Sequence, residues 1–154
     1  MAITRFAGRP VESGSAPPTP PTPGTPTTYV RTYTVGLGLG DVAYQKADGT
    51  ADQADASALA TSKPMGVVSA IDSPAVGQCE IVHSGDVAVT GPLTPGAVYI
   101  LGSSPGVLVD ITDTVNPNYP AYATPGSGES LVIVGVAQAA GSLAVNLQGI
   151  SATG

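Results

Sequence analysis

Apolar and polar residues alternate over many short segments of this chain, and Gly- and Pro-rich turns separate these segments. Residues 29–35 (YVRTYTV) are rich in β-branched and aromatic side chains, which are typical of strands. Further strands are predicted at residues 41–45, 65–71, 78–83, 85–90, 97–101, 107–111, 131–139 and 142–147. Short strands spaced about 8–12 residues apart predict an all-β fold, a small sandwich or barrel of short antiparallel strands. Residues 51–62 are expected to form a loop or a short helix, and no other segment offers a helix.

The N-terminal segment follows a different pattern. Residues 13–28 (SGSAPPTPPTPGTPTT) have almost no apolar surface to bury, so folding alone would not offset the entropy of ordering them. A free segment of this kind is a polyproline-type tether. We therefore predict that residues 1–28 form an extended Pro/Thr-rich arm that lies along a partner, and that residues 29–154 form the β body. The predicted partner-contacting residues are Ile3, Arg5, Phe6, Arg9, Pro17, Pro18, Pro20, Pro21 and Pro23.

The body contains a faint internal repeat. The matched segments are 40–44 with 96–99, 65–70 with 134–139, and 79–85 with 143–149. Their order is the same in both copies, which predicts two related β units at about residues 36–90 and 91–150. Chance similarity between Gly/Val/Ala-rich strands is the alternative explanation.

Composition and charge limit the classes of function and partner that this chain is expected to have. Charged residues make up 10% of the chain, whereas about 25% is usual. Such a weakly charged surface suits burial in a large assembly, and we expect a homo-oligomer, most simply a trimer. The formal charge is +2 over residues 1–39 and −8 over residues 40–154, which argues against a nucleic-acid partner. No apolar run approaches the ~18 residues of a membrane span, and the N-terminus lacks the pattern of a signal peptide, so synthesis in a cytoplasm is expected.

Residue types that carry chemistry are few. Cys79 is the only cysteine and His83 the only histidine, which excludes an internal disulfide and leaves too few ligands for a typical zinc site. On one strand Cys79, Ile81 and His83 share a face, and four residues at ~3.3 Å each separate the thiol from the imidazole by ~13 Å. That distance is too long for proton transfer, so both residues are predicted to be structural.

The carboxylates do not indicate a catalytic or metal site either. Four of them cluster in sequence and two flank a later loop: Asp41, Asp48, Asp52, Asp55, Asp110 and Asp113. Asp48 and Asp110 are predicted to form turns, because a short carboxylate side chain can bond to nearby backbone. None of these segments has the spacing of a calcium loop. We therefore expect no catalytic residue, no metal and no cofactor.

Residues 112–129 form a long loop rich in Pro, Asn, Tyr and Gly. A connection of about 18 residues is longer than most, so it is a candidate contact surface. Its candidate contact residues are Asn116, Pro117, Asn118, Tyr119 and Tyr122.

An ordered series of turn-and-strand motifs runs through about residues 36–148. The motifs are GDVAYQKADG (40–49), MGVVS (65–69), GDVAV (85–89), LTPGAVYIL (93–101), SPGVL (104–108) and VGVAQ (134–138). This series resembles capsid decoration (cement) proteins of tailed bacteriophages, and also modules of phage head and tail fibres. The resemblance implies a β-rich, often trimeric protein that clamps major capsid subunits on the outer surface of the virion and carries out no catalysis.

Two alternatives stay open beside this expectation. A fibre or adhesion module would bind a cell-surface glycan through an exposed pocket of Tyr, Asp and Asn. A small cell-wall hydrolase would need two facing carboxylates in a cleft. Fibres usually carry long repeats or coiled-coil stalks, and this sequence has neither, which favours the decoration protein.

Overall fold

The computed structural model describes residues 26–121 and 130–150, which form nine antiparallel strands. The strands are β1 (Thr27–Thr32), β2 (Val42–Gln45), β3 (Ala51–Gln53), β4 (Pro64–Ile71), β5 (Gln78–Ala88), β6 (Val98–Leu101), β7 (Leu108–Asp110), β8 (Leu131–Ala139) and β9 (Ser142–Ile150). The described residues contain no helix, so the all-β prediction is confirmed. None of them forms a helix long and apolar enough to cross a membrane.

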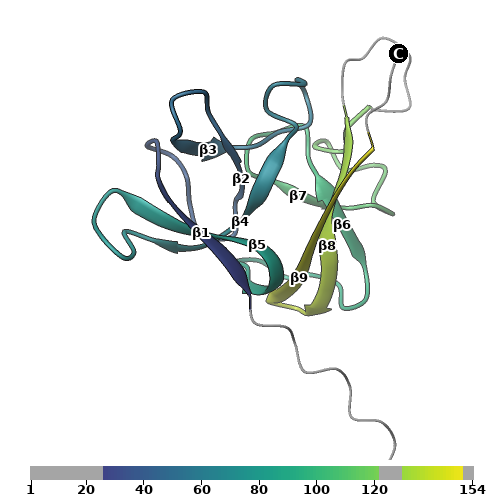
Figure 1. Cartoon of the computed structure of the whole chain (residues 1–154). Helices are drawn as coiled ribbons and strands as arrows, with labels where there is room; N and C mark the ends of the chain where they lie inside the picture. Colours follow the sequence, from purple (N-terminus) through teal and green to yellow (C-terminus); the bar gives the residue numbers. More distant parts are fainter. Residues whose placement is uncertain (1–25, 122–129, 151–154) are drawn as a thin grey trace, which may run out of the picture.

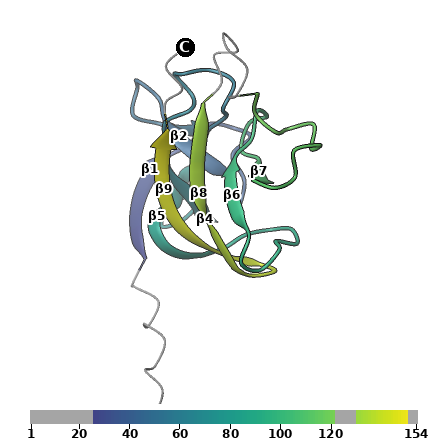
Figure 2. The same cartoon turned by 90° about the vertical axis from the view of Figure 1, so that its right-hand side faces the viewer.

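All nine strands belong to one curled sheet. Its order is β3-β2-β4-β5-β9-β8-β6-β7, and β1 pairs with β5 beside this path (Figure 1). We call β2 to β5 the first half-sheet and β6 to β9 the second half-sheet. Both halves have the same order: their first strand lies between the second and third, and their fourth strand follows the third. The sheet curls into a half-barrel, and Figure 2 shows β9, β8 and β6 side by side on its second half.

Strand β5 joins the two halves. Its residues 78–84 pair with β1, and its residues 84–88 pair with β9. Its residues 79–82 also pair with β4, so the pairing with β9 begins just after the pairing with β4 ends. The two strands predicted at 78–83 and 85–90 are one continuous strand, because the chain stays extended while its partner changes.

Two hydrophobic cores lie on opposite faces of the first half-sheet. The inner core lies between the two halves and includes Val67, whereas the outer core includes the next residue, Val68. Consecutive residues of a strand point to opposite faces, so both faces of β4 are buried. The remaining outer-core residues are Leu37, Ala43, Ala51, Cys79 and Ile81.

The segment predicted as a loop or a helix is a short strand followed by an irregular loop. Ala51 pairs with Gln45 of β2 and forms a parallel bridge with Tyr33. Beyond β3, Ala56 donates a backbone hydrogen bond to the carbonyl of Gly102 at 2.8 Å. These partners lie on other segments and replace the local bonds of a helix, so the helical alternative is wrong.

Candidate functional site

Strand β1 is the most exposed strand among the described residues. Five of its six residues are exposed, including Tyr29 at 38% and Val30 at 41%. Tyr29 and Val30 are consecutive, so they point to opposite faces, and both faces of the strand are accessible. The strand begins at Thr27, two residues before the predicted start of the body. The predicted contact residues of the arm, Ile3 to Pro23, lie outside the described residues.

Three side chains form a cluster over β1 and β5, which we call the β1 patch: Tyr29, Arg31 and His83. The rings of Tyr29 and His83 meet edge to face, with centroids 5.6 Å apart and planes at 64°. The guanidinium carbon of Arg31 lies 5.5 Å from the centre of the Tyr29 ring, within cation–π range. Nδ1 of His83 lies 2.9 Å from the carbonyl oxygen of Met65, which fixes the imidazole against β4.

Cys79 and His83 have different surroundings although they lie on one strand. Cys79 is fully buried in the outer core, and this burial raises the pKa of its thiol. His83 is exposed at the rim beside Tyr29. Strand alternation places His83 on the same face as the buried Cys79 and Ile81, but the outer core does not extend as far as His83. Cys79 is therefore a small buried residue of the core.

Most of the described carboxylates accept hydrogen bonds from residues close to them in the sequence and so stabilise the turns in which they lie. Oδ1 of Asp48 accepts hydrogen bonds from the backbone N–H of Thr50 at 2.9 Å and from its hydroxyl at 2.6 Å. The hydroxyl bond is the main reason why the pKa of Asp48 falls below its ordinary value. The same pairing joins Asp55 to Ser57 and Asp110 to Thr112. The turns predicted at Asp48 and Asp110 are confirmed, and the signal that marks all three is D-x-S/T.

A groove of about 310 Å³ lies between the two half-sheets. Asp41 lines it, with Oδ2 accepting hydrogen bonds from the Gly38 N–H at 2.7 Å and from Nε2 of Gln53 at 2.8 Å. Tyr99 also lines it but is only 6% exposed, so its ring cannot serve as a stacking platform. Asp41 is the one carboxylate among the described lining residues. The described part of the chain contains no group of three or more His, Cys, Asp or Glu that could hold a metal ion.

The predicted contact loop folds back onto the second half-sheet as far as it is described. The Ser103 N–H donates to the carbonyl of Asn118 at 2.9 Å, and the Ser104 hydroxyl donates to Oδ1 of Asn118 at 2.6 Å. Asn118 also donates its own N–H to Oδ1 of Asn116, and the hydroxyl of Tyr119 donates to the carbonyl of Ile111. Pro117 is exposed, and Tyr122 lies outside the described residues. The polar groups that suggested an external contact therefore also organise the loop itself.

Comparisons with known proteins give no match: no family model fits the chain, and neither the curated proteins nor the solved structures contain a significant relative. The resemblance to decoration proteins therefore rests on the sequence motifs, and a function has to be argued from the surfaces described above.

Proposed function

We propose that this chain is a structural virion protein that binds the outer capsid surface and stabilises it by bridging major capsid subunits. The observation that carries the proposal is the exposure of β1 directly after the Pro/Thr arm. A strand that keeps Tyr29 and Val30 accessible on opposite faces has apolar surface left to bury. A protein partner that covers β1 and engages the arm would gain roughly 25 cal/mol for each Å² of apolar surface removed from water.

Two further features support a structural role. The carboxylates of Asp48 in the β2–β3 turn and of Asp110 at the end of β7 accept hydrogen bonds within their own turns, as expected of a stiff body. The low fraction of charged residues, 10%, keeps the cost of burying surface between protein copies small. A trimer with three such contact regions would multiply weak contacts into stable attachment. The proposal requires no cofactor, nucleic acid or membrane.

The test uses phage particles from a strain whose gene for this protein is deleted. Particles without the protein should release their DNA at a lower temperature than complete particles, and the purified full chain should restore the difference when added back. Adsorption to host cells should be unchanged. Particles of unaltered heat stability would contradict the proposal, and particles that no longer adsorb would favour a fibre or adhesion module.

The groove between the half-sheets favours the fibre or adhesion module as a second candidate. A glycan could donate hydroxyl hydrogen bonds to Asp41, whose carboxylate is already oriented by Gly38 and Gln53. Loss of host adsorption in an Asp41→Ala variant with unaltered heat stability would support this function over capsid stabilisation. A cell-wall hydrolase has less support, because Asp41 has no second described carboxylate facing it in the groove.

A further inference from the structure

The starting observation is an imbalance of charge in the described body. Its basic residues are Arg31, Lys46 and Lys63, whereas nine residues are acidic. Lys46 lies 4.0 Å from both Asp48 and Asp52. Arg31 has no described carboxylate within 4.0 Å, so its charge is not compensated by an ion pair.

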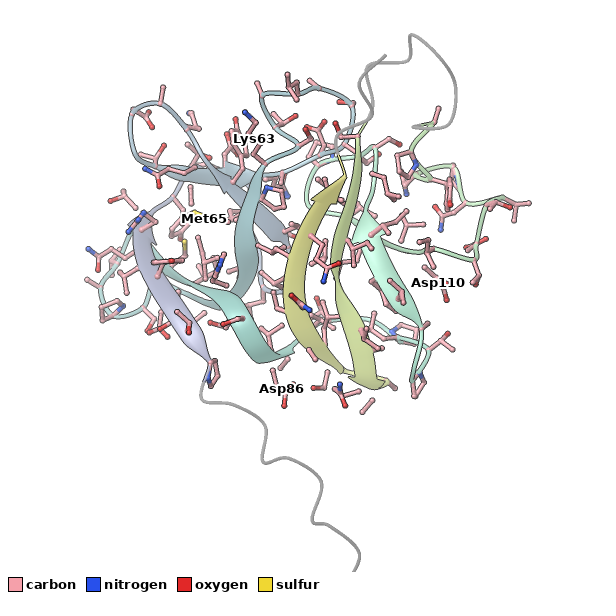
Figure 3. The ribbon with its side chains drawn as sticks, turned by 45° about the vertical axis from the view of Figure 1, so that its right-hand side comes forward. Lys63, Met65, Asp86 and Asp110 are labelled. Carbon is pink, nitrogen blue, oxygen red and sulfur yellow. The ribbon has the colours of Figure 1, made fainter. Side chains whose placement is uncertain are left out.

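The carboxylates nearest in the fold to the β1 patch are directed elsewhere. Glu80 is the cross-strand neighbour of Val30, which places it on the face of β1 opposite Tyr29 and Arg31. Its carboxylate accepts a hydrogen bond from the Ser73 hydroxyl at 2.6 Å. Asp72 accepts hydrogen bonds from the Tyr33 hydroxyl at 3.0 Å and from the Gly77 N–H at 2.8 Å. Figure 3 shows Met65, which fixes His83, on the side of β1, and Asp110 on the far side of the second half-sheet.

The patch is also held in place before any partner binds. Nη1 of Arg31 donates to the carbonyl of Val30 at 2.8 Å, and the guanidinium lies near the Tyr29 ring. The guanidinium has five N–H donors, so most of them are available for a ligand. Because the carbonyl of Met65 can only accept, Nδ1 of His83 carries the proton, and the ring contact with Tyr29 fixes the imidazole. A fixed arginine beside an exposed tyrosine suits a planar carboxylate, which it can bind with two parallel hydrogen bonds.

We propose that the β1 patch docks an acidic segment of a protein partner, with Arg31 binding a Glu or Asp side chain and Tyr29 packing against the adjoining chain. The inference rests on the proposed function, since it names the chemistry of the partner surface that β1 meets. A protein segment fits better than a phosphate polymer. The acidic body would repel a long polyanion, whereas a segment with a few carboxylates needs only the local positive charge of the patch.

The experiment measures binding of a hexaglutamate peptide to the full chain at low ionic strength by NMR titration. The resonances of His83 and of the Arg31 side chain should shift, and Arg31→Gln should weaken binding at least tenfold. Arg31→Lys keeps the charge but cannot form the two parallel hydrogen bonds, so its affinity should lie between those of the unmodified chain and of Arg31→Gln. Lys46→Gln is the matched control, because Lys46 already faces Asp48 and Asp52, and it should change affinity less than twofold. Unshifted backbone resonances away from position 31 confirm that each variant is folded.

Three results would overturn the inference: no binding of hexaglutamate, equal weakening by Arg31→Gln and Lys46→Gln, or tighter binding of polyphosphate than of hexaglutamate. The particle assay separates this inference from the proposed function. If Arg31→Gln protein stabilises particles as well as the unmodified chain, the docking role of the β1 patch is contradicted, while the structural role of the protein is supported. If hexaglutamate binds at Arg31 but particles without the protein are as heat-stable as complete particles, the docking role of the β1 patch is supported and the structural role is contradicted.

Discussion

The two half-sheets have the same strand order, but different segments cover their outer faces. The first half is covered by the chain after β1, where the Thr34 N–H donates to the carbonyl of Ala51 at 3.0 Å and Leu37 enters the outer core. On the second half, the described part of the loop after β7 bonds to Ser103 and Ser104 through Asn118, and its Pro120 is completely buried. The loop folds back onto its own half-sheet, whereas β1 pairs with β5 and remains exposed. The strand with the most exposed residues, β1, therefore lies on the first half.

The largest effects should come from one glycine in each half. A Cβ atom at Gly66 of β4 would collide with the backbone carbonyl of Val82, and one at Gly135 of β8 would collide with that of Ala144. Backbone cannot move aside as a flexible side chain does, so Gly66→Ala and Gly135→Ala should each cost about 3 kcal/mol or more. Denaturant unfolding of the two variants measures whether the halves are equally sensitive.

Gly141→Ala is the control for this pair. Its nearest neighbour would be the carbonyl oxygen of Val89 at 3.8 Å, an ordinary contact distance, so stability should change little. If only one of the two strand glycines is sensitive, the packing of the halves differs in spite of their shared strand order.

The next prediction tests the cover of the first half. Leu37 is 6% exposed and packs in the outer core, whereas Leu39 in the same segment is 50% exposed. Leu37→Ala should cost about 2–3 kcal/mol because it leaves a cavity, and Leu39→Ala should cost less than about 0.5 kcal/mol. Thermal unfolding by circular dichroism compares them. Equal losses would mean that Leu37 does not hold the segment after β1 against the outer core.

Much of the fold could be predicted from the sequence, because strand alternation and Gly/Pro turns are local signals. Predicted strand ends agree with the observed ones to within about three residues, and β8 has the predicted bounds. Strand β3 was not predicted, because Ala51–Gln53 is extended only through its pairing with β2. The two covers also depend on contacts between distant segments, which alternation does not encode.

The candidate site was less predictable for the same reason. The three side chains of the β1 patch come from segments about fifty residues apart, and only the register of β1 on β5 brings Tyr29 to His83. The patch was thus not predicted, although Tyr29 and Arg31 were correctly expected in one strand. The D-x-S/T turns, by contrast, are local and can be identified in the sequence.

A substitution with a smaller expected effect on stability tests whether the loop after β7 is held against the second half. Oδ1 of Asn118 accepts the Ser104 hydroxyl at 2.6 Å and so ties the loop to the segment before β7. Asn118→Ala should cost about 1 kcal/mol, the usual value of one hydrogen bond. Asn146→Ala is the matched control on the exposed face of β9 and should be neutral. Amide hydrogen exchange should show faster opening of residues 112–120 in Asn118→Ala, and unchanged exchange there would contradict the proposed tie.

The smallest effect concerns the D-x-T turn of the first half, and its sign follows from the lowered pKa of Asp48. Hydrogen bonds from Thr50 hold this pKa below the ordinary value of 3.8, so folding favours the charged carboxylate. Its contribution to stability is therefore complete above the unfolded pKa and disappears as the pH falls through the lower folded pKa. Because Asp48 is exposed, Asp48→Ala should lower Tm by no more than ~2 °C at pH 7, and the difference between the two proteins should shrink as the pH falls below 3.8. Asp86→Ala is the control, because no hydrogen bond to Asp86 from described residues is present, and it should leave Tm at pH 7 unchanged. A difference for Asp48→Ala that persists unchanged at pH 2 would mean that the turn is held by its shape and not by the charge of its carboxylate.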